Sequence, residues 1–131
     1  AAVNVTDEQL AEMRKVLGQM RGHLGPAHIA EYRELNRRFH SIISESAPDR
    51  SFLAHTLSQT WSAFPSMRWS NVGTTAKAPL PGRGPNDVAE HAAALAALEA
   101  RDPDAAERAV RAHVEEAGRL LLSVFEETRE P

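Results

Sequence analysis

Apolar residues recur at intervals of three and four positions over several long stretches of the chain, with polar residues between them. This period is that of an amphipathic α helix, and the strict alternation of a half-buried strand is missing. Breaks rich in glycine and proline separate the stretches. The pattern predicts an all-α fold, an antiparallel bundle of about five to six helices. The predicted helices cover residues 6–20, 27–46, 51–69, 86–100 and 102–127.

Capping residues mark where several of these helices begin. Thr6 precedes the first helix, and Gln9 three positions later completes the pattern of a capping box. Asn86 and Asp87 are the expected caps of the fourth helix, and Asp102 is the expected cap of the fifth. Because the connection between these last two helices is very short, we expect them to be antiparallel neighbours.

Residues 70–85 differ from the rest of the chain in composition. They contain three glycines, three prolines and two adjacent threonines, a mixture that sustains neither a helix nor a strand. The sequence predicts a loop here, and its composition fits either a lid over a pocket or a tether.

Length and hydropathy bound the class of protein. A chain of 131 residues suits a single helical domain, residues 1–131, with one core. No stretch approaches the ~20 consecutive apolar residues of a membrane span. The first residues also lack the basic-then-apolar pattern of a secretory signal. We therefore expect a soluble, cytoplasmic protein with no membrane partner.

Charge and cysteine content exclude some kinds of site. The net charge is −3, and basic residues are interspersed with acidic ones rather than clustered, so this chain alone is not expected to bind DNA. The absence of cysteine excludes disulfides, thiolate metal sites and cysteine nucleophiles. Any metal site must therefore use nitrogen and oxygen ligands, from histidine, carboxylate or amide groups.

Two of the six histidines fall on apolar helical faces. His113 shares its face with Val110 and Leu120, three and seven positions away. His91 continues at helical spacing into Leu95. The pattern predicts that both imidazoles point into the bundle.

Asn36 and His40 lie four residues apart beside the apolar seam of the second predicted helix, so they share one face. Three inward imidazoles and one amide oxygen, supplied by three helices, match the way helical bundles build metal sites. Three histidines also leave coordination positions open for water or an anion. The alternative is that each histidine is a core residue with a single hydrogen-bond partner, and spacing alone leaves both interpretations open.

The other three histidines carry less weight. His23 lies beside a glycine break and His28 near the start of the second helix, so both are expected to be solvated. His55 falls on the third predicted helix, where a position at the edge of the core is expected in preference to the wall of a cavity.

Several of these residues together resemble a known family. The run ELNRRFH at residues 34–40, the pair EH at residues 90–91 and His113 in the last helix are similar to the FCD effector domain of FadR-type GntR transcription regulators. The run EARD at residues 99–102 resembles the family's turn before its last helix. The resemblance extends from the second predicted helix to the end of the chain.

The resemblance implies a metal site and an effector. It places Asn36, His40, His91 and His113 at the family's metal-ligand positions, with zinc expected first and nickel second. It also implies a small carboxylate effector, for which Arg68 is the candidate arginine because a guanidinium binds a carboxylate bidentately. Asn36 stands where the family often has aspartate, so it is a weaker, neutral ligand or orients water or the effector.

The resemblance further implies a regulatory domain rather than an enzyme. It suggests a homodimer in which DNA is bound only by an N-terminal winged helix-turn-helix domain, which this sequence does not contain, and a truncated first helix. One rival is a metal-dependent hydrolase-like enzyme. It lacks an evident general base, since Glu34 and Glu90 are expected to point away from the ligand face. The other rival is a metal-free dimerisation bundle.

Overall fold

The computed structural model describes residues 1–48, 55–56 and 83–127. Within these residues every regular element is helical and no strand occurs, which confirms the predicted all-α class. The predicted helix over residues 51–69 and most of the predicted loop over residues 70–85 lie outside the described residues.

The first helix forms as the capping pattern predicts, and the second follows it. Helix α1 spans Asp7–Gly22, and Thr6 and Gln9 form the full capping box, with each side chain accepting from the other residue's backbone N–H. A short 3-10 helix, η1 (Pro26–His28), leads into α2 (Ile29–Glu45). The second predicted helix is therefore confirmed, with its first turn tightened.

Helix α5 spans Arg83–Glu99 and begins three residues before the predicted start. The predicted cap at Asp87 is therefore wrong: Asp87 lies inside the helix. Pro85 does not prevent this earlier start, because a proline in the first turn of a helix removes only an N–H that has no partner within the helix.

Helix α6 spans Pro103–Glu127. Asp102 caps it as predicted, since its Oδ1 accepts from the Ala105 N–H at 2.9 Å. Helix α5 ends in a Schellman motif, in which the Arg101 N–H donates to Leu98 O and the Asp102 N–H to Ala97 O, both at 3.1 Å. Arg101 holds the left-handed position of this motif, with φ of 55°, where glycine is usual.

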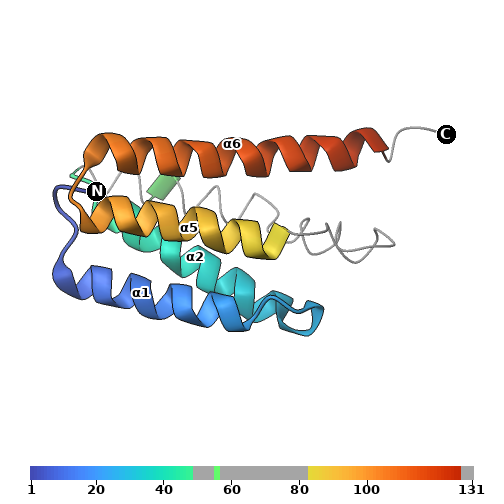
Figure 1. Cartoon of the computed structure of the whole chain (residues 1–131), viewed down its shortest axis with the longest axis horizontal. Helices are drawn as coiled ribbons and strands as arrows, with labels where there is room; N and C mark the ends of the chain where they lie inside the picture. The colour runs from blue at the N-terminus through green and yellow to red at the C-terminus, as the bar shows by residue number, and fades with distance from the viewer. Residues whose placement is uncertain (49–54, 57–82, 128–131) are drawn as a thin grey trace.

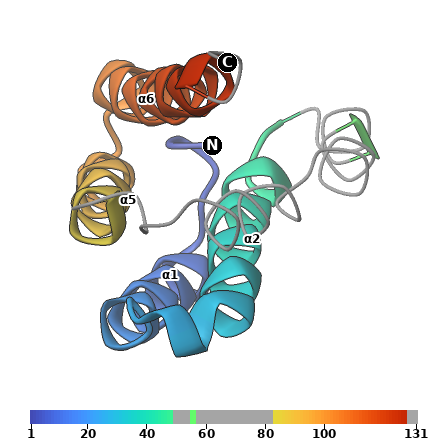
Figure 2. The ribbon, with the colours of Figure 1, turned by 90° about the vertical axis from the view of Figure 1, so that its right-hand side faces the viewer.

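The described helices form two antiparallel hairpins, α1 with α2 and α5 with α6 (Figures 1 and 2). Helix α1 packs against both α2 and α5, so it joins the two hairpins. Its buried stripe faces Phe39 and Ile42 of α2 and the apolar side of α5. The fully or largely buried residues of α1 are Leu10, Met13, Val16, Leu17 and Met20.

The residues before α1 also belong to the packed structure. Ala2 and Val5 are buried with the core. The Arg101 guanidinium donates to Val5 O and also contacts Asp7, Nη2 to Oδ1 at 3.1 Å. The turn between α5 and α6 is thereby attached to the segment that enters α1. No helix in the described part of the chain is both long enough and apolar enough to cross a membrane.

Candidate metal centre

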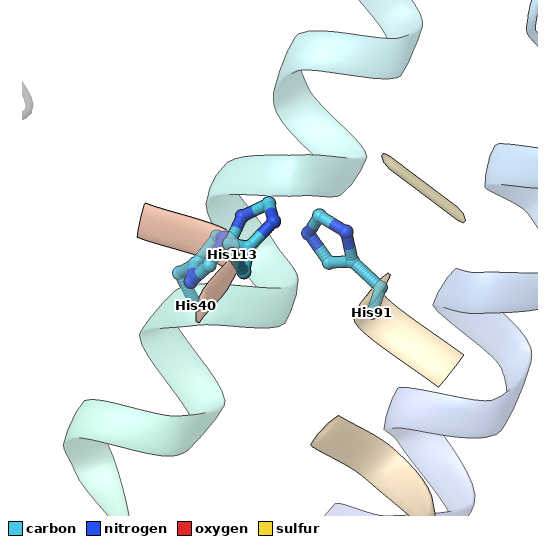
Figure 3. A group of neighbouring side chains, drawn as sticks. All are labelled: His40, His91 and His113. Atoms are coloured by element: carbon cyan, nitrogen blue, oxygen red, sulfur yellow. The ribbon is translucent and has the colours of Figure 1, made fainter. Parts of the chain in front are cut away.

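Three imidazoles meet between the two hairpins. His40 comes from α2, His91 from α5 and His113 from α6, and their rings face one another (Figure 3). One ring nitrogen from each lies within 4.8 Å of those of the other two. The ring centroids are 4.5 Å apart for His91 and His113, 5.0 Å for His40 and His91, and 5.2 Å for His40 and His113. The sequence spacing correctly predicted that these side chains point inward.

The imidazole rings pack against the apolar core on one side. His91 is only 1% exposed, and Leu95 and Leu98 continue its face of α5 as buried residues. Phe39 of α2 is fully buried, and its ring lies 4.8 Å from that of His91 at an interplanar angle of 73°. His113 is 8% exposed on α6. The cluster therefore lies at the edge of the core rather than on the surface.

Hydrogen bonds to the Nδ1 atoms select the tautomers of two rings. His91 Nδ1 lies 2.7 Å from the backbone carbonyl of Asp87, and His113 Nδ1 lies 2.7 Å from Oε2 of Glu90. A carbonyl or carboxylate oxygen accepts, so in each neutral ring Nδ1 carries the proton. The Nε2 atoms of His91 and His113 then have the free lone pair that a metal ligand needs.

Electrostatics keep the third ring neutral. Burial away from water, followed by the repulsion expected from His91 and His113, lowers the pKa of His40 from 6.5 to about 3. Three imidazoles at this separation cannot all be positively charged imidazolium ions without strong repulsion. The ground state of His40 at neutral pH is therefore the neutral imidazole, which is the form that binds a metal.

Two acidic residues of α5 lie on the Nδ1 side of the cluster. Asp87 is 8% exposed and accepts a hydrogen bond from the Tyr32 hydroxyl. Its carboxylate oxygens lie 3.6 Å from His91 Nδ1 and 3.8 Å from His113 Nδ1. Asp87, Glu90 and His113 form a second group whose ligand-type atoms lie within 4.8 Å of one another.

Sequence spacing did not identify either acid as part of the cluster. The sequence predicts that Glu90 points away from the ligand face, and the structure adds a hydrogen bond to His113 Nδ1 that spacing did not predict, because the side of α5 next to His91 faces α6. Asp87 was assigned to a cap. Its spacing of four residues from His91 placed the two on one helical face and was the signal that could have identified it.

The remaining predicted residues are distributed as follows. Asn36 is partly buried on α2, one turn before His40. Arg68 lies outside the described residues. His28 is exposed as expected, and His23 is partly exposed, with Nδ1 2.7 Å from Gln19 O. The expected core-edge position of His55 is wrong, because the residue is exposed.

A separate open depression of about 280 Å³ lies between α1 and α2. Its lining includes the charged residues Glu12, Lys15 and Arg38 and contains no histidine. Because Arg38 there is already bound to Glu12, at 2.6 Å and 2.7 Å, the depression offers no converging set of ligand groups. The chemistry of the described residues is concentrated at the histidines.

Comparison with known proteins identifies the family of the chain. A model of the FCD domain family matches residues 1–116, a range that contains α1, α2, α5 and the part of α6 that bears His113. No curated protein and no solved structure matched the chain. Domains of this family are regulatory and bind effectors rather than catalyse reactions, and they often bind a metal. The chain belongs to the FCD family, the C-terminal effector-binding domain of GntR-type regulators.

Proposed function

We propose that this domain senses a small carboxylate through a divalent metal ion held by His40, His91 and His113, with Asn36 as the fourth protein ligand. The observation that carries the proposal is the convergence of three imidazole nitrogens, from three helices, within 4.8 Å of one another. Helical bundles commonly build metal sites in this way, from side chains that project inward from facing helices.

The donor set fits a transition metal. Neutral imidazole nitrogens suit zinc and nickel, with zinc first. The hydrogen bonds at Nδ1 of His91 and His113 leave Nε2 of each ring as the donor, and the low pKa of His40 keeps that ring unprotonated. A bound ion would supply a Lewis-acidic position open to an anionic oxygen, which is the property a carboxylate sensor needs.

The position of the centre supports a regulatory role. His40 belongs to one hairpin, whereas His91 and His113 belong to the other, so a ligand set that includes all three joins the two hairpins. A carboxylate that binds one arrangement of the hairpins better than another shifts the population toward it. In a homodimer, such a shift would change the relative placement of attached DNA-binding domains. Arg68 is the proposed partner of the effector carboxylate.

The nearby acids support sensing over hydrolysis. Glu90 already accepts a hydrogen bond from His113 Nδ1, on the opposite side of that ring from the proposed metal. A general base must instead lie within hydrogen-bond reach of the attacking water. The family's regulatory character points the same way.

The decisive test is the metal content of untagged protein purified without chelator. We expect near-stoichiometric zinc or nickel in the parent and none in the His40→Ala, His91→Ala double variant, with helicity of both measured by circular dichroism. The matched control is the His23→Ala, His28→Ala double variant, which removes two histidines outside the cluster and should retain the metal. A folded parent that neither contains zinc or nickel nor takes them up on titration would overturn the proposal in favour of a metal-free bundle.

The effector is tested next, with a panel of small carboxylates in thermal-shift measurements. We expect stabilisation of the metal-loaded protein and none after treatment with EDTA. Equal shifts in both forms would show that the carboxylate does not depend on the metal. Hydrolysis of ester or amide substrates by the loaded protein, lost with the metal, would support the enzyme instead.

A further inference from the structure

The proposed ligand set poses a problem of charge. Asn36 and three neutral imidazoles carry no net charge, so a divalent ion held by them alone would be surrounded only by neutral groups at the edge of an apolar core. Desolvating a cation without a compensating negative charge is costly. The structure places two carboxylates, Asp87 and Glu90, directly behind the histidines.

Glu90 has the geometry of an orienting group for His113. Its Oε2 lies 2.7 Å from His113 Nδ1, and its side chain is 25% exposed, so the contact is partly shielded from solvent. A carboxylate that accepts from the second nitrogen of an imidazole fixes the tautomer, holds the ring and raises the basicity of the ligating nitrogen. His91 obtains its tautomer differently, from the backbone carbonyl of Asp87.

The side-chain carboxylate of Asp87 contributes charge, whereas its backbone carbonyl sets the tautomer of His91. Its carboxylate is held by the Tyr32 hydroxyl, with one oxygen 3.6 Å from His91 Nδ1 and the other 3.8 Å from His113 Nδ1. These separations are too long for hydrogen bonds but short for a charge interaction in a poorly solvated site. Tyr32 is on α2, so this contact also spans the two hairpins.

We infer that Glu90 is a positioning residue for the metal centre: it sets His113 in the Nδ1-protonated tautomer and, together with Asp87, supplies the negative charge that the ligands lack. This inference rests on the proposed metal site, but its first consequence concerns the metal-free protein. In the metal-free parent, His113 is already protonated at Nδ1 and presents Nε2 to the centre.

The tautomer is measured in metal-free protein by long-range ¹H–¹⁵N correlation spectra of the imidazoles. We expect the Nδ1-protonated pattern for His113 in the parent and a shift toward the Nε2-protonated form in Glu90→Ala. Glu90→Gln should largely restore the parent pattern, because its amide oxygen can accept the same hydrogen bond. The matched control is Glu99→Gln, which removes a carboxylate of the same helix that binds Arg14 instead. An Nε2-protonated His113 in the metal-free parent would overturn the inference.

Metal affinity is measured on the same variants by competition with a chromogenic chelator, using zinc alone. We expect the dissociation constant to rise about 10- to 100-fold in Glu90→Ala with unchanged stoichiometry. The increase should be smaller in Glu90→Gln and absent in Glu99→Gln. Equal affinity in parent and Glu90→Ala would overturn the positioning role, and complete loss of binding in Glu90→Gln would instead make Glu90 a direct ligand. Failure of the parent to bind zinc would contradict the proposed function and leave the tautomer result standing as a separate test.

Discussion

The two hairpins have the same antiparallel topology, but the two helices within each hairpin are joined by different kinds of contact. In α5–α6 a Schellman motif, a left-handed Arg101 and the Asp102 cap are all contained in a short turn. In α1–α2 the connection is longer and includes η1, and His28, the N-cap of α2, makes no side-chain capping hydrogen bond. The α1–α2 pair has instead contacts between residues distant in sequence, such as Arg38 with Glu12.

This difference is reflected in the candidate site. His91 and His113 are fixed relative to each other by the local geometry of α5–α6. His40 is placed through tertiary contacts, which include the packing of α2 on α1, the contact of Phe39 with His91 and the hydrogen bond of Tyr32 to Asp87. One half of the centre is therefore set locally, and the other half depends on the tertiary core.

The largest expected effect comes from removing a buried side chain at the contact between the hairpins. Phe39→Ala should lower the free energy of unfolding by about 3–5 kcal/mol, because it deletes a fully buried ring and leaves a cavity beside His91. Urea unfolding followed by circular dichroism measures the change. Leu122→Ala, on a residue 64% exposed, is the control and should stay within about 0.5 kcal/mol. A loss below about 1 kcal/mol for Phe39→Ala would mean that the hairpins do not depend on this contact.

Acid should weaken the metal-free fold through His40. Folding lowers the pKa of His40 from 6.5 to about 3. As the pH drops below 6.5, His40 is therefore protonated in the unfolded chain but stays neutral in the folded chain. The contribution of His40 to the free energy of unfolding is therefore complete above pH 6.5 and is lost progressively toward pH 3. At pH 5 about 2 kcal/mol of this contribution has been lost.

The measurement is urea unfolding of EDTA-treated protein at pH 8 and pH 5, for the parent and for His40→Gln. The groups facing His40 include His91 and His113 and, behind them, Asp87 and Glu90, and all of these remain in the variant. The variant should lose correspondingly less stability on acidification. The same loss in both proteins would assign the acid sensitivity to other groups.

Effects of intermediate size on stability are expected from substitutions at the N-caps of α6 and α2. Asp102→Ala should cost about 1 kcal/mol, because the Ala105 N–H loses its acceptor at the start of α6. His28→Ala at the start of α2 should cost less than about 0.5 kcal/mol, because no side-chain cap is lost there. Thermal and urea unfolding of both variants check the difference. Equal costs would contradict the view that the helix after the connecting turn has a side-chain cap in α5–α6 but not in α1–α2.

The smallest expected effect is at the surface of α1–α2. Arg38 binds Glu12 and Glu45 while its own side chain remains 37% exposed. Arg38→Gln should therefore cost less than about 1 kcal/mol. The cost should shrink in about 1 M salt, where the Debye length falls to about 3 Å. A large cost that salt does not change would show that Arg38 acts through packing of its stem rather than through charge.

The elements predicted correctly from the sequence are those with local signals. The capping box at Thr6 and the cap at Asp102 gave correct helix starts, and helical spacing placed His91 and His113 inward. The start of α5 was missed because glycine and proline at its first residues read as loop, although a first helical turn tolerates proline.

The part of the site that could not be predicted depends on which helices are neighbours. Glu90 binds a histidine 23 positions away, and the Tyr32 hydroxyl reaches Asp87 over 55 positions. Periodicity gives the face of one helix but not the identity of the helix opposite. The caps and the inward histidines needed only one element, whereas these contacts needed the packing of two.

The attachment of Arg101 to Val5 links residues 96 positions apart. Because Arg101 sits in the turn that joins the helices of His91 and His113, any rigid displacement of that hairpin carries the bonded backbone at Val5 and the carboxylate of Asp7 with it. The segment that leads into α1 therefore moves together with the hairpin that supplies two of the three imidazoles.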